Sequence, residues 1–103
     1  MQTVTISDAR TFSLRDVQRR DLVRSDDLHV ELLCFEAGQR DADVTVDHDR
    51  LYQVLEGEVI VRGEDTPRRL GKGTLLSVPS GTTHTLENAG GGLLVVMATS
   101  RAS

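Results

Sequence analysis

The sequence predicts an all-β domain, either a sandwich or a barrel of short strands. Short apolar stretches recur along the chain, and Gly, Asp, Asn and Pro separate them at close intervals. Apolar and polar residues alternate in several stretches, for example at residues 43–47, which is the period of a strand with one buried face. The 103 residues are enough for a single domain with one core, and they contain no internal repeat or linker.

The expected elements follow one another from the N-terminus. Residues 3–7 are predicted as a terminal strand, and residues 8–17 as one short helical turn or an irregular crossing. The clearest long strand covers residues 28–36. Further strands are expected at residues 20–24, 43–46, 51–55, 58–62, 68–70, 75–78, 83–87 and 93–98. Within the single domain 1–103, residues 1–27 are thus an N-terminal strand and crossing segment, and residues 28–98 the barrel core.

Composition and charge exclude several classes of partner. Charged residues make up 27% of the chain and apolar residues 38%, which is ordinary for a globular domain. The net charge is -4 with both signs interspersed, so we expect no nucleic-acid partner. There is no apolar run long enough for a membrane span, and the first fifteen residues lack the apolar core of a secretory signal. We therefore expect a cytoplasmic protein without a membrane partner, in which the single cysteine, Cys34, is buried filler.

One motif connects the predicted strands to a known family. Gly73, Pro79, Gly81, His84 and Asn88 follow the spacing G-x5-P-x-G-x2-H-x3-N. This run resembles the second conserved motif of the cupins at every fixed position. The resemblance implies a double-stranded β-helix, or jelly-roll barrel, over most of the chain. It also implies that His84 occupies the position of the family's third metal-binding histidine.

The first cupin motif keeps its spacing but has lost its ligands. The family pattern is G-x5-H-x-H-x3,4-E-x6-G, and Gly38 and Gly57 stand at its two ends. Between them, Val44, Val46 and Arg50 occupy the positions of His, His and Glu. Valine has no donor atom, and arginine is permanently cationic. We therefore expect no metal cofactor of the family type.

The resemblance places a pocket inside the barrel, and Arg50 is its least ordinary member. A guanidinium buried in an apolar barrel is costly unless it is paired. Its partner could be an internal carboxylate, Glu36 or Glu87, or a ligand carboxylate or phosphate; alternatively, a shift of the preceding loop would bring Arg50 to solvent. The expected ligand-binding residues are Val44, Val46, Arg50, Tyr52, His84 and Leu86.

Three functions remain open. The first is a metal-free module that binds or senses a small anionic molecule. The second is an enzyme, either metal-free with His84 as base and Tyr52 as acid, as in the sugar-epimerase branch of the cupins, or metal-dependent through an unusual set that includes His84 and His48. The third is a structural dimeric barrel without ligand.

A homodimer is expected in any case, because the strand at residues 28–36 is apolar on both faces and one barrel interior covers only one of them. The sequence does not identify the ligand.

Overall fold

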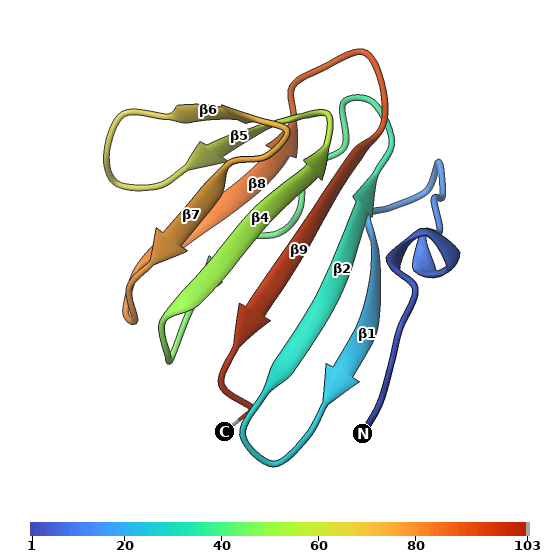
Figure 1. Cartoon of the computed structure of the whole chain (residues 1–103). Coiled ribbons are helices and arrows are strands. Elements are labelled where there is room, and N and C mark those ends of the chain that lie inside the picture. Colours follow the sequence, from blue (N-terminus) through green and yellow to red (C-terminus); the bar gives the residue numbers. More distant parts are fainter. Residues whose placement is uncertain (103) are drawn as a thin grey trace.

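The computed structural model describes residues 1–102 and consists of two antiparallel sheets that face each other (Figure 1). The five-stranded sheet has the order β1-β2-β9-β4-β7, and the four-stranded sheet has the order β3-β8-β5-β6. The strands are β1 (Gln18–Arg24), β2 (His29–Phe35), β3 (Val44–Thr45), β4 (Arg50–Glu56), β5 (Glu58–Arg62), β6 (Arg68–Gly71), β7 (Leu75–Val78), β8 (Thr83–Asn88) and β9 (Leu94–Ser100). The chain crosses repeatedly between the sheets, as in a jelly roll, so the all-β prediction is confirmed.

The N-terminal segment differs from the prediction. The expected strand at residues 3–7 is wrong: a short 3-10 helix, η1 (Ile6–Ala9), stands there instead, and residues 10–17 cross irregularly to β1. The physical reason is that β1 takes the edge position beside β2, and the earlier residues have no strand to pair with. They pack against the outer face of the five-stranded sheet, where Ile6, Ala9 and Phe12 join the cluster around Leu32. Within residues 1–102 no helix is long and apolar enough to cross a membrane.

The main core lies between the two sheets. Alternation in β2 and β9 points Leu33, Phe35, Leu94 and Val96 inward, and each is at most 1% exposed. They meet the inward side chains of the four-stranded sheet, such as Val59. Burying one such side chain stabilises the fold by about 1.5–3 kcal/mol, so this core holds the sheets together.

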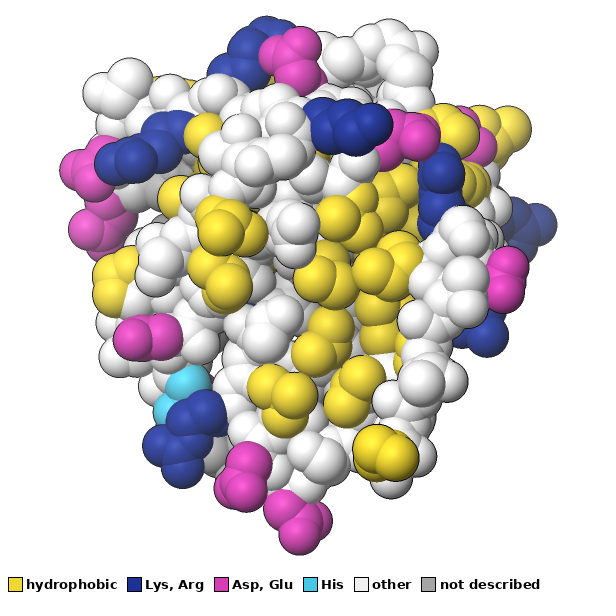
Figure 2. All heavy atoms as spheres, in the orientation of Figure 1, with side chains coloured by type: hydrophobic (Ala, Val, Ile, Leu, Met, Phe, Trp, Pro, Cys, Tyr) yellow, Lys and Arg dark blue, Asp and Glu magenta, His cyan; other side chains and the backbone are white. Residues whose placement is uncertain are grey.

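The outer face of the five-stranded sheet is also apolar. The N-terminal segment covers Leu32 and Cys34 there, and Cys34 is only 2% exposed, as expected of buried filler. Further along this face, Val30 and Met97 are half-buried and Leu51 is 41% exposed. Figure 2 shows the resulting band of hydrophobic side chains running down the front of this sheet. Part of the second apolar face is therefore covered within the chain, and part is open.

The turns follow from the glycines of the two motifs. All four, at positions 38, 57, 73 and 81, have positive φ angles. Gly57, between β4 and β5, has φ +83°, and a Cβ atom there would stand 2.4 Å from the backbone oxygen of Leu93. Gly73 has φ +86° with open space around it. Position 57 requires glycine for two reasons, the left-handed backbone and the close approach of Leu93. At position 73 only the left-handed backbone favours glycine.

The third strand is shorter than predicted, with two residues instead of four. It pairs with β8 only at Val44 and Thr45. Val46 leaves the ladder, and its oxygen accepts a 2.7 Å hydrogen bond from the Gly81 nitrogen. The Val46 nitrogen also donates to the Thr82 oxygen at 3.5 Å, so the turn before β8, and not β8 itself, takes both backbone hydrogen bonds of Val46.

Candidate functional site

Three side chains predicted for the site form a hydrogen-bonded chain. Arg50 and Tyr52 project inward from β4, and His84 projects inward from β8 in the opposite sheet. Nη1 of Arg50 donates to the hydroxyl of Tyr52 at 3.3 Å. That hydroxyl lies 2.6 Å from Nε2 of His84. Nδ1 of His84 lies 3.4 Å from the carbonyl oxygen of Thr82.

The protonation states of this chain are consistent with one another. Burial raises the pKa of Tyr52, so the phenol keeps its proton at neutral pH. Burial lowers the pKa of His84, and the positive charge of Arg50 acts in the same direction. A neutral imidazole with its proton on Nδ1 donates to Thr82 and accepts from Tyr52 through Nε2. The phenol oxygen then accepts from Arg50, so the hydroxyl of Tyr52 and both ring nitrogens of His84 have partners.

The other predicted pocket residues belong to the core. Val46, Tyr52 and Leu86 are each 3% exposed and pack in the cluster between the sheets. Val44 is half-buried and is the β3 partner of His84. The structure therefore brings the predicted side chains together, but Tyr52 and Leu86 occupy the space between the sheets where the expected pocket would lie. Pockets lie on both sides of this hydrogen-bonded chain: two border His84, and another borders Arg50.

Arg50 does not use an internal carboxylate, so, of the alternatives for its partner, the one with Glu36 or Glu87 is wrong. Glu87 pairs with Arg62 at 3.5 Å, on the other sheet. Within residues 1–102, no carboxylate oxygen lies within 4.0 Å of a guanidinium nitrogen of Arg50. The half-buried guanidinium is held by Tyr52 and faces a pocket at the end of the barrel.

The end pocket, as we call this cavity of about 250 Å³, is mainly polar and carries more positive than negative groups. Among residues 1–102, Arg50 and Arg101 stand in its wall with His29 and His48, against one carboxylate, Asp47. Its other lining residues are Thr45, Val46, Ser100 and Ala102. His48 therefore lies in this pocket, on the turn between β3 and β4.

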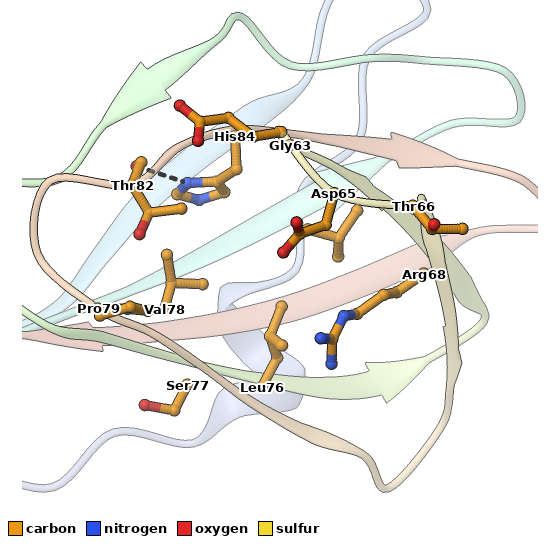
Figure 3. A pocket seen from close by; sticks show the side chains of 12 residues that line it. Gly63, Asp65, Thr66, Arg68, Leu76, Ser77, Val78, Pro79, Thr82 and His84 are labelled. Atoms are coloured by element: carbon orange, nitrogen blue, oxygen red, sulfur yellow. Dashed lines mark hydrogen bonds between the residues drawn. The ribbon is translucent and has the colours of Figure 1, made fainter.

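A second cavity, the side pocket, lies next to His84 and has a volume of about 280 Å³ (Figure 3). The hairpin that joins β5 to β6 forms one wall, and β7 with the turn after it forms the other. Its lining residues are Val61, Gly63, Glu64, Asp65, Thr66, Arg68, Leu76, Ser77, Val78, Pro79, Thr82 and His84. Two carboxylates and one guanidinium give this cavity the opposite charge balance to the end pocket.

The residues present do not fit the metal of the cupin pattern. Two of its four ligand positions are valines and one is a guanidinium, which would repel a cation. The remaining donor atom, Nε2 of His84, already accepts the hydrogen bond from Tyr52. A single imidazole is too few ligands for a tight divalent site.

One other cluster has metal-binding residue types. Donor atoms of Asp21, His29 and Glu31 on β1 and β2 lie within 4.8 Å of one another. Glu31 already accepts from Arg19 at 2.9 Å, and Asp21 pairs with Arg24 at 3.4 Å and with His29 at 2.7 Å. These groups satisfy one another as an ion-pair network on the sheet surface.

Sequence reasoning missed the residues that give each pocket its charge. In the end pocket, Arg101 and His29 stand at the ends of strands that contain no family motif. In the side pocket, Asp65 and Arg68 belong to a segment whose sequence is that of an ordinary polar turn. No local pattern distinguishes them, because their shared cavities form only when distant strands come together.

Comparison with known proteins relates the chain to a family and to solved folds. A family model described as Cupin domain matches residues 32–99. The protein TT1209 from Thermus thermophilus has a structure that superposes with a TM-score of 0.90 at 20% identity, covering 98% of this chain and 97% of that one. An RmlC-like cupin from Desulfovibrio desulfuricans gives 0.87 at 21% identity, covering 99% and 97%.

A third solved structure has the same fold. An uncharacterised conserved protein with a double-stranded β-helix domain from Klebsiella pneumoniae gives a TM-score of 0.90 at 17% identity, covering 99% of this chain and 90% of that one. No curated protein sequence matches the chain. The likenesses confirm the double-stranded β-helix fold that the motifs predicted.

Proposed function

The chain belongs to the cupin domain family, and within it we propose that this protein binds a small anionic molecule without a metal. The observation that supports this function is the guanidinium of Arg50. It is half-buried at the wall of the end pocket, and within residues 1–102 it has no carboxylate partner. A cation that is partly removed from water and lacks a carboxylate partner favours a bound anion.

The charge of the end pocket supports the same ligand class. Arg50 and Arg101 line it with His48 and with His29, which is bound to Asp21, and among residues 1–102 the carboxylate in its wall is that of Asp47. Only Nη1 of Arg50 is bound to Tyr52, which leaves other donors of the planar fork for a carboxylate or phosphate. The side pocket, with Glu64 and Asp65 against Arg68, would repel a simple anion. The anion therefore belongs next to Arg50.

A thermal-shift titration with inorganic phosphate, succinate and glucose tests this function. A ligand that binds only the folded state raises the Tm in a saturating manner, by the equivalent of about 2.7 kcal/mol at a hundred times Kd. We expect phosphate or succinate to do so and glucose not. Arg50→Gln should remove the response. Arg69→Gln is the matched control, because Arg69 pairs with Glu58 on β6, away from the end pocket.

Equal responses in the two variants, or none to either anion in the wild type, would overturn the role of Arg50. A structural barrel without ligand would give that second result.

The Tyr52–His84 pair favours one other function, a metal-free acid–base enzyme. A phenol 2.6 Å from an imidazole is the geometry of proton transfer between two groups. Only His84 of the pair borders the side pocket, and Tyr52 is buried in the core. A substrate would have to reach His84 from there. This function predicts that His84→Gln abolishes turnover while leaving phosphate or succinate binding at Arg50 intact.

We also propose a cytoplasmic location, because a reducing compartment suits the buried free thiol of Cys34.

A further inference from the structure

We propose that the side pocket is a second binding site, separate from Arg50, for a zwitterion with an apolar body. An α-amino acid with an aliphatic side chain is the simplest such molecule. The inference rests on three features of this cavity: two opposite charges without partners, an apolar wall facing them, and a small volume.

The charges come from the hairpin between β5 and β6. Asp65 and Arg68 both line the side pocket, and Figure 3 shows them reaching into it from the same hairpin. They do not pair with each other, and within residues 1–102 neither has an ion-pair partner within 4.0 Å. The next residue, Arg69, points the other way and pairs with Glu58 at 3.1 Å. The hairpin therefore offers the cavity one carboxylate and one guanidinium with unused hydrogen-bonding capacity.

The opposite wall is apolar. Leu76 and Val78 of β7 project toward Asp65 and Arg68 across the cavity (Figure 3). Val61 of β5 and Pro79 after β7 extend this surface. Val61 and Val78 are already buried, so an aliphatic side chain placed here would remove from water chiefly its own apolar area and that of Leu76 and Pro79.

These features together select a zwitterion. An ammonium group would bind Asp65, with Glu64 as a second carboxylate in the wall, and a ligand carboxylate would bind Arg68. A simple acid would meet the two carboxylates, and a simple amine would leave Arg68 unpaired. The volume of about 280 Å³ is at the lower end of ligand pockets, which suits a molecule of amino-acid size.

Isotope-labelled protein titrated with L-leucine, and followed by amide NMR, tests this site. Three probes each lack one feature: 4-methylpentanoate lacks the ammonium, 3-methylbutylamine lacks the carboxylate, and glycine lacks the side chain. We expect leucine to shift the resonances of residues 63–66 and 75–78 and to bind at least about tenfold more tightly than each probe. Asp65→Asn and Arg68→Gln should each weaken leucine binding by about tenfold or more.

A control variant shows whether binding depends on the side pocket itself. Arg69→Gln removes the same charge from the neighbouring position, outside the side pocket, and should leave leucine binding unchanged. Because residues 64–68 are exposed, the variants there should fold normally.

Three outcomes would overturn the inference: no leucine-dependent shifts at these residues, equal binding of 4-methylpentanoate, or an equal loss in Arg69→Gln. Each would leave the anion site at Arg50 standing, and failure of the anion site would leave this one standing.

Discussion

The hydroxyl of Tyr52 lies 2.6 Å from Nε2 of His84 and joins the two sheets across the barrel interior. Tyr52 belongs to β4 and His84 to β8, and each residue is 3% exposed. Their rings also meet edge to face, with centroids 5.4 Å apart and an interplanar angle of 71°. A polar pair thus stands at the one ligand position of the cupin motifs that this chain retains, His84.

Removing the hydroxyl of Tyr52 should lower the free energy of unfolding. Tyr52→Phe leaves Nε2 of His84 buried without a partner, and we expect a loss of about 1–3 kcal/mol in the free energy of unfolding. Urea denaturation measures it. Thr45→Val is the control, since it removes a 2.6 Å hydroxyl pair at an exposed position and should cost much less. Equal losses would mean that burial of the Tyr52–His84 pair is energetically unimportant.

The depressed pKa of His84 predicts a pH dependence of stability. Because the folded protein holds the imidazole neutral, the unfolded chain binds more protons as the pH falls below the usual histidine pKa of about 6.5. The contribution of His84 to the free energy of unfolding is therefore highest above that pH. It declines as the pH falls below it, until the pH reaches the lower pKa of His84 in the folded protein and the folded state also takes up the proton. His84→Gln, which cannot titrate, should lose less stability than the wild type between about pH 7 and pH 5. Parallel pH profiles would contradict this assignment.

Two motif glycines, Gly57 between β4 and β5 and Gly73 before β7, should respond differently to alanine. At Gly73 the cost is that of a left-handed backbone alone, about 1–2 kcal/mol. At Gly57 the new Cβ would also meet the Leu93 oxygen at 2.4 Å, so the backbone must shift. We expect Gly57→Ala to cost clearly more than Gly73→Ala in chemical denaturation. The reverse order would show that the approach of Leu93 to Gly57 is readily relaxed.

Protein purified without chelator should contain less than about a tenth of an equivalent of any transition metal, since a functional site binds tightly. Elemental analysis measures this directly. Restoring the family ligands through Val44→His, Val46→His and Arg50→Glu should raise the metal content, because His84 and the spacing of the motifs are retained. A stoichiometric metal in the wild type would show that other residues hold it.

We propose that a second copy of the chain covers the open band on the outer face of the five-stranded sheet. Val30, Leu51, Leu55 and Met97 stand in this band, and Gln53 between them is uncharged, so a two-fold pairing meets no like charges there. Sedimentation should find a dimer at micromolar concentration. Leu51→Glu should shift it to monomer, whereas Leu14→Glu, at an exposed residue in the N-terminal crossing, should not. A monomeric wild type would remove the proposal.

The sequence by itself determined the fold and the loss of the family ligands. Turns are local: the glycines of the two motifs adopt positive φ angles because of their own backbone, and the motif spacing therefore predicted the turns at these four positions. Alternation within a strand is equally local: it placed Arg50 and Tyr52 on one face, while the inward direction of His84 came from the motif, and both Tyr52 and His84 are buried. The N-terminal strand at residues 3–7 was predicted wrongly, because a strand also needs a partner edge and no local pattern supplies one.

Only the tertiary structure decided the site. Arg50 bonds to Tyr52 instead of to Glu36 or Glu87, because β4 and β8 bring the phenol and imidazole together and place those carboxylates elsewhere. The side pocket likewise exists only because the β5–β6 hairpin and β7, which belong to different sheets, face each other. Charge complementarity in a cavity depends on distances between strands far apart in the chain, and a sequence read alone does not contain those distances.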